Sequence, residues 1–204
     1  MTTALLIIDV QESFRRRPLW QAVSNPDIVD DVALLARAAR EAGDLVVWVL
    51  HSEPGSGTVF DPAGGYVRLI EPLAELDGEP VLIKTSRNAF TTTRLQQLLT
   101  ERGITKLTIS GIQTEQCCET TARLAADLGY EVTFVTDATA TFPIPHRDAP
   151  ADRSVGEILA DPRTLPCEAV IERTEYALAG RFATLRTVAE LTGGLTVAAM
   201  LTGS

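Results

Sequence analysis

The sequence predicts an α/β fold, namely a three-layer α/β/α sandwich around a six-stranded parallel sheet in which residues 1–204 form a single domain. Two observations lead to this prediction. Short apolar runs without polar alternation, which are typical of strands buried on both faces, recur along the chain. Helical patterns separate these runs at intervals of about 30 residues, as in successive right-handed βαβ units. For this fold class we expect the strand order 3-2-1-4-5-6.

Six strands are expected, each from an apolar or β-branched run. The first run, Ala-Leu-Leu-Ile-Ile-Asp-Val, contains no alternation and has a carboxylate next to its end. Such a pattern is typical of the centre of a parallel sheet. The expected strands are 4–10, 45–50, 80–84, 106–110, 131–136 and 169–171.

The helices between the strands are marked by capping residues and by glycine stops. Asn25-Pro26-Asp27 begins a helix that Gly43 ends, and Thr91 or Thr92 caps a helix that Gly103 ends. A third helix is capped by a threonine and begins with two adjacent cysteines. The expected helical segments are 26–43, 91–103, 114–129, 151–159 and 175–191.

Two loops and an apolar tail complete the chain. Segments 51–65 and 139–150 are rich in glycine, proline or serine and are expected to be loops that shape a site. The tail 195–201 is apolar, which predicts that it packs on the domain or on a partner copy. We therefore expect a homo-oligomer, a dimer or larger.

Composition excludes several classes of function. A chain of 204 residues that is 45% hydrophobic can bury a sizeable core without disulfides or metal. Its net charge of −9 argues against a nucleic-acid partner, and no apolar run approaches the ~18 residues of a membrane span. Three cysteines and the absence of a basic leader predict a reduced, cytoplasmic protein. Two histidines without a paired spacing predict no metal site, and no cofactor is expected.

Three polar residues stand at or just past the ends of expected strands: Asp9, Lys84 and Cys117. In a doubly wound sheet the ligand site lies beyond the carboxyl ends of the strands, at the reversal of strand order, so Asp9 and Cys117 are expected in one crevice. With Thr114 as N-cap, Cys117 would lie in the first helical turn, where the helix dipole lowers a thiol pKa. The alternative is structural: Cys117 and Cys118 are both small buried residues, and periodicity does not choose between them.

These residues lie in motifs that resemble the isochorismatase-like cysteine hydrolases, which include nicotinamidases, N-carbamoylsarcosine amidohydrolases and isochorismatase. The resemblance implies a catalytic triad of Asp9, Lys84 and Cys117. It also implies a non-proline cis peptide before Gln113, with the Gln113 and Cys117 N–H groups forming an oxyanion hole. The matching segments, which together extend over residues 4 to 142, are 4–14, 84–90, 111–122, 129–132 and 137–138.

Departures from the family narrow the expected chemistry. Nicotinamidases carry an Asp-x-His and a further histidine that bind a metal, whereas His51 has no second histidine nearby. True isochorismatases act without the cysteine nucleophile, so Cys117 favours the branch that cleaves amides. The substrate-binding candidates are Phe14, Trp20, Asn88 and Phe142.

The predicted function is that of a cofactor-independent cysteine hydrolase. It would cleave a small amide or carbamoyl-type C–N bond through a thioester acyl-enzyme, with a small molecule as its partner. Two alternatives stay open. One is hydrolysis of a non-amide bond, such as a vinyl ether, on the same scaffold. The other is a non-catalytic protein that binds a small ligand or senses oxidants through Cys117 and Cys118.

Overall fold

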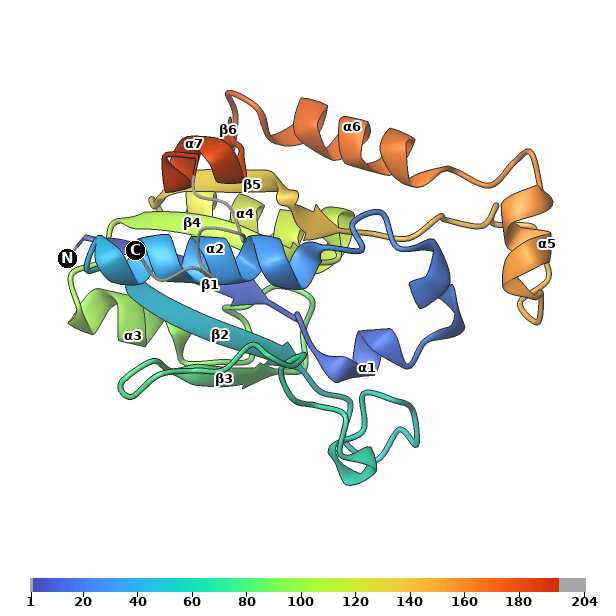
Figure 1. Ribbon diagram of the computed structural model, residues 1–204, viewed down its shortest axis with the longest axis horizontal. Helices are drawn as coiled ribbons and strands as arrows, with labels where there is room; N and C mark the ends of the chain where they lie inside the picture. Colours follow the sequence, from blue (N-terminus) through green and yellow to red (C-terminus); the bar gives the residue numbers. More distant parts are fainter. Residues whose placement is uncertain (1, 195–204) are drawn as a thin grey trace.

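The central layer of the molecule is a sheet of six parallel strands in the order β3-β2-β1-β4-β5-β6 (Figure 1). The computed structural model describes residues 2–194. Both the parallel sheet and its order confirm the prediction. The strands are β1 (Thr3–Ile8), β2 (Leu45–His51), β3 (Val81–Lys84), β4 (Lys106–Ile112), β5 (Glu131–Ala140) and β6 (Thr184–Arg186).

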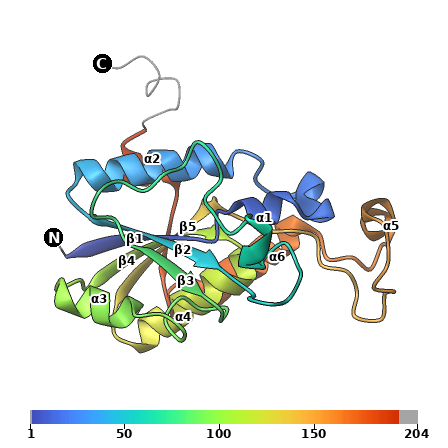
Figure 2. The ribbon, with the colours of Figure 1, turned by 90° about the horizontal axis from the view of Figure 1, so that it is seen from below.

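Helices cover both faces of this sheet. Helix α2 (Ile28–Glu41) lies on one face, while α3 (Leu95–Glu101) and α4 (Glu119–Asp127) lie on the other, which gives the three layers (Figure 2). The other helices lie in the connections, and all of them except α6 are short. They are α1 (Glu12–Arg15), η1 (Pro18–Ala22), η2 (Pro62–Gly64), η3 (Thr114–Cys118), α5 (Val155–Ala160), α6 (Cys167–Leu178) and α7 (Val188–Thr192).

The apolar run of β1 is explained by a core on each side of the sheet. Leu6 and Ile8 pack with the residues of α3 and α4, whereas Leu5 and Ile7 pack with those of α2. Successive side chains of a strand point to opposite faces, so a strand covered on both sides must be apolar at every position. Burial of each such side chain contributes about 1.5–3 kcal/mol relative to exposure.

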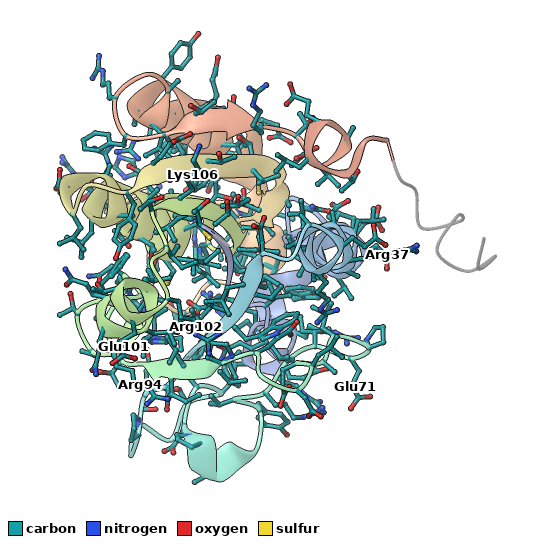
Figure 3. All side chains as sticks on the ribbon, turned by 90° about the vertical axis from the view of Figure 1, so that its left-hand side faces the viewer. Arg37, Glu71, Arg94, Glu101, Arg102 and Lys106 are labelled. Atoms are coloured by element: carbon teal, nitrogen blue, oxygen red, sulfur yellow. The ribbon has the colours of Figure 1, made fainter. Side chains whose placement is uncertain are left out.

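A glycine lets β1 and β4 approach closely where both strands end. Gly111 has a φ of +131° and pairs with Ile8, and a Cβ at this position would overlap the Ile8 carbonyl oxygen. Any side chain here would separate the two strands. The glycine therefore holds the carboxyl ends of β1 and β4 side by side, on the side of the sheet where α1 lies (Figure 1). Figure 3 views the opposite end, where charged side chains such as Glu101, Arg102 and Lys106 lie at the surface.

The predicted sixth strand at 169–171 is wrong, because these residues belong to α6. Val170, Thr174 and Leu178 are buried at a spacing of four, so the apolar run is one turn of an amphipathic helix. A run of three apolar residues is too short to separate the two periods. The true edge strand, β6, interrupts the helical segment expected at 175–191.

Several helix boundaries also differ from the prediction. Helix α3 begins at Leu95, and it is Thr93 that accepts a hydrogen bond from the Leu95 N–H, at 3.0 Å, in place of Thr91 or Thr92. Helix α5 begins later than expected, after a capping box at Ser154. The tail 195–201 lies outside the described residues.

Candidate active site

Three side chains from three different strand ends meet in the structure. The Lys84 Nζ lies 2.7 Å from Asp9 Oδ2 and 3.3 Å from Cys117 Sγ. Asp9 directly follows β1, Lys84 is the last residue of β3, and Cys117 lies in η3 just after β4. The side chains of Asp9 and Lys84 are 0% exposed, and Cys117 is 3% exposed. The structure thus brings together the three residues that the strand ends singled out.

Asp9 has an unusual backbone and an unpaired oxygen. Its φ of 56° lies in the left-handed region, which costs a non-glycine residue about 1–2 kcal/mol. Its Oδ1 is buried and has no hydrogen-bond partner within residues 2–194, while Oδ2 accepts from Lys84. Burial raises the pKa of the Asp9 carboxyl although the lysine opposes this shift. One carboxylate oxygen is therefore held and the other is free to accept a proton.

Cys117 lies in a single turn of π-helix rather than in a regular helix start. The N-cap residue is Gln113, whose carbonyl accepts from the Cys118 N–H at 3.1 Å. Thr114, the predicted cap, instead donates its hydroxyl to Thr139 at 2.8 Å. The peptide bond between Ile112 and Gln113 is cis, as the resemblance implied.

The expectation of a lowered pKa for Cys117 is wrong. Burial, followed by the negative charge of Asp9, raises the pKa of the thiol to about 12, and Lys84 only partly offsets this. The loss of solvent around the sulfur therefore outweighs the helix dipole. At pH 7 Cys117 therefore rests as a thiol. Cys118 is fully buried in the core, where burial also raises its pKa.

A cavity of about 410 Å³ opens onto Cys117. Its floor includes Asp9 and Gln113, and its apolar wall is formed by Phe14 and Phe60. A larger cavity of about 550 Å³ lies near the ends of β5 and β6, where its lining contains neither lysine nor cysteine. Because it contains none of Asp9, Lys84 and Cys117, we assign the candidate site to the cavity at Cys117.

The four residues predicted to bind substrate have different positions. Phe14 lines the cavity. Phe142 lies behind it, with ring centroids 6.0 Å apart, and Trp20 packs on Phe142 at 6.3 Å, so both support the wall rather than form it. Asn88 is outside the lining, because its Oδ1 accepts from the backbone N–H groups of Phe90 and Thr91 and stabilises a turn.

Sequence reasoning missed a polar residue that organises the floor of the site. Gln11 is buried, and its side chain accepts from the His51 N–H at 2.7 Å and donates to the His51 carbonyl at 3.0 Å. This pair of bonds ties the segment after β1 to the end of β2. The position of Gln11, a polar residue two places after Asp9 and the apolar run, was the available signal.

His51 lines the cavity, with its Nδ1 3.5 Å from Lys84 Nζ and its Nε2 3.2 Å from Glu53. Burial, together with the positive charge of Lys84, lowers the pKa of His51, so the ring is neutral at pH 7.

Within residues 2–194, no group of three or more His, Cys, Asp or Glu side chains is arranged to hold a metal. No helix in the same range is long and apolar enough to cross a membrane.

Comparison with known proteins agrees with the fold. The model of the isochorismatase domain matches residues 3–176. Streptothricin hydrolase of Streptomyces noursei is 39% identical over 145 residues, which are 70% of this chain but only 56% of that protein. Nicotinamidase 3 of Arabidopsis thaliana is 34% identical over 68% of this chain and 73% of its own. A crystal structure of an isochorismatase from Pseudomonas putida superposes with a TM-score of 0.78, at 31% identity, over 93% and 89% of the two chains. The chain belongs to the isochorismatase family of hydrolases.

Proposed function

We propose that this protein is a cofactor-independent cysteine hydrolase that cleaves an amide or carbamoyl-type C–N bond of a small molecule. Cys117 is the nucleophile, Asp9 is the general base and then the general acid, and Lys84 is their electrostatic partner. The observation that carries the proposal is the single buried ammonium group within hydrogen-bond distance of both Asp9 and Cys117. A relative named nicotinamidase supports the choice of an amide.

The raised pKa of Cys117 determines how the first step proceeds. Since the thiol is protonated at rest, its proton moves to Asp9 as Sγ attacks the substrate carbonyl carbon. The free Oδ1 of Asp9 is the acceptor for this proton. The backbone N–H groups of Gln113 and Cys117 stabilise the oxyanion. Asp9 then returns the proton to the leaving nitrogen, the C–N bond breaks, and an amine or ammonia departs.

The second step releases the acyl group. A water molecule attacks the thioester carbonyl while Asp9 accepts one of its protons. The C–S bond breaks, and the sulfur takes the proton back from Asp9, which restores the resting thiol. In the resting enzyme and in the acyl-enzyme the negative charge next to Lys84 is on Asp9. In each tetrahedral intermediate Asp9 is protonated and the charge is on the oxyanion, so the buried site contains one negative charge throughout the cycle.

Hydrolysis of a non-amide bond is the second candidate. It is favoured by the Pseudomonas putida relative, which is described as an isochorismatase. The same nucleophile and oxyanion hole would serve an ester-like carbonyl, whereas a vinyl ether offers no carbonyl for Cys117 to attack. Loss of activity on replacing Cys117 therefore separates hydrolysis at a carbonyl carbon from hydrolysis of a vinyl ether.

The test is ammonia release from a panel of small primary amides and ureido compounds. We expect turnover in the wild type, a loss of at least about 10³-fold in Cys117→Ala, and near-normal turnover in the matched control Cys118→Ala. Intact mass spectrometry after rapid quenching should find the acyl group on Cys117. Turnover that survives in Cys117→Ala, or a panel with no ammonia release, contradicts the proposal.

Assembly and location are part of the same proposal. We expect a homo-oligomer, supported by exposed apolar side chains on the edge strand β3, where Val81 and Ile83 are 39% and 49% exposed. Light scattering that returns 22 kDa at micromolar concentration would contradict it. A cytoplasmic location is supported by three free cysteines.

A further inference from the structure

Three consecutive arginines follow one another from the end of α1, and the structure gives each a different environment. Arg15 pairs with Glu12 at 3.3 Å, and the guanidinium of Arg16 lies over the Tyr66 ring at 4.6 Å. Only Arg17 lines the cavity that contains Cys117, with its guanidinium 5.7 Å from the centroid of the Phe14 ring. This short basic cluster therefore contributes one cation to the site.

Arg17 is half-buried and forms no ion pair in the described part of the chain. Burial and the nearby charge of Arg87 lower the pKa of Arg17, while Glu115 and Glu53 act in the opposite direction. Within residues 2–194 neither Arg17 nor Arg87 forms an ion pair. By contrast, the partly buried Arg40 is paired with a glutamate at 2.7 Å. A half-buried guanidinium without a carboxylate is costly unless an anion from outside completes it.

Arg87 lies on the same cavity and is exposed, with its Nη1 3.4 Å from the neutral His51 ring. It follows β3 by three residues, so it reaches the cavity from a different part of the chain than Arg17, which follows α1. Two guanidinium groups thus face the space in front of Cys117 from two separate segments.

The carboxylates near the cavity are already engaged. Asp9 is neutralised by its buried lysine partner. Glu53 accepts from Thr58 and contacts His51, and Glu115, outside the lining, accepts from the Thr141 hydroxyl. With the histidine neutral, two arginines against one partly buried glutamate leave about one positive charge on the lining. One uncompensated charge fits a monoanion better than a phosphate dianion.

We propose that the substrate carries a carboxylate that Arg17 and Arg87 bind while Cys117 attacks its amide or carbamoyl carbon. The substrate class is then the monoamides and carbamoyl derivatives of small carboxylic acids. This inference rests on the proposed function for its chemistry, but the anion site can be tested without turnover. Planar guanidinium groups suit carboxylates because they donate two parallel hydrogen bonds.

The kinetic test uses malonamate, succinamate and glutaramate, each paired with its neutral methyl ester. We expect the best acid to exceed its ester at least tenfold in kcat/KM. Arg17→Met should lower kcat/KM for the acid about ten- to a hundredfold, chiefly through KM, because a hydrogen bond to a charged group is lost. The loss for the ester should be at least several times smaller. Arg16→Met, which removes a neighbouring cation outside the cavity, is the matched control and should change neither.

The binding test uses calorimetry on Cys117→Ala with the same six compounds. We expect an acid to bind more tightly than its ester, and Arg17→Met in this background to remove the difference. If binding discriminates but the wild type releases no ammonia, the anion site stands and the proposed function fails. If ammonia is released yet acids and esters bind alike, or Arg17→Met and Arg16→Met act equally, the anion site is refuted while the function stands.

Discussion

Replacing Asp9 by Asn should slow turnover and at the same time make Cys117 easier to alkylate. The carboxylate raises the pKa of the thiol because a negative charge disfavours a second one nearby. Lys84 Nζ lies 3.3 Å from Sγ, where two unit charges attract by about 5 kcal/mol at an effective dielectric constant of about 20. In the wild type Asp9 competes for this ammonium at 2.7 Å. Without the carboxylate, the ammonium stabilises the thiolate alone.

The expected size of the effect follows from the pKa of about 12. If the pKa falls by about two units, the thiolate fraction at pH 7 rises about a hundredfold, and the lower nucleophilicity of a less basic thiolate reduces this to about tenfold in rate. Turnover should fall by about 10²–10⁴-fold, since the general base is lost. Lys84→Met should shift alkylation in the opposite direction, to slower rates and higher pH.

The assay is iodoacetamide labelling of Cys117, followed by peptide mass spectrometry from pH 6 to 10, together with ammonia release. Breaking a buried ion pair costs about 3–5 kcal/mol, so urea titration must first show that each variant is folded at 25 °C. Asp31→Asn, which removes a carboxylate from the other cavity, is the control. If Asp9→Asn slowed both alkylation and turnover, or kept near-normal turnover, the role of Asp9 as a base would have to be abandoned.

Three further predictions test the fold and the chemistry. Gly111→Ala should lower the free energy of unfolding in urea titration by more than about 3 kcal/mol, because the new methyl group meets Ile8. The control Gly129→Ala has open space around it and should lower this free energy by about 1–2 kcal/mol. Equal losses would contradict the close approach of β1 and β4. Stability should fall from about pH 9 to pH 11, because burial raises the pKa of Cys167 to about 11 and the thiol of the unfolded chain releases its proton at lower pH. In urea titrations at each pH, Cys167→Ala should make this fall shallower. Dialysis against EDTA should leave ammonia release unchanged, and a loss that zinc restores would contradict a metal-free mechanism.

The amino-acid sequence by itself determined the class of sheet and the location of its first five strands, but not the sixth strand. The apolar runs of β1 and β2 are unbroken because both faces of these strands are covered, so their pattern depends only on burial. Charged residues at the ends of apolar runs stand out, which is why Asp9, after β1, and Lys84, at the end of β3, could be selected from the residue pattern. The sheet order is the one expected of doubly wound sheets built from right-handed βαβ units.

Short segments and capping residues could not be assigned in the same way. The apolar triplet at 169–171 fits a strand and a helix equally, and packing of α6 against α4 decided for the helix. Thr114 has the residue type of a cap, but its hydroxyl found a partner in Thr139 on β5. In both cases the deciding contact comes from residues distant in the sequence.

Electrostatics at the site was decided by the tertiary structure alone. Arg15, Arg16 and Arg17 are identical in type and adjacent in sequence, yet only Arg17 lines the cavity. The pKa of Cys117 likewise depends on how many atoms exclude water from the sulfur and on the distance to Lys84, which belongs to a different strand. Desolvation and charge separation are properties of assembled elements, so a local pattern predicts which residues can react but not in which protonation state they rest.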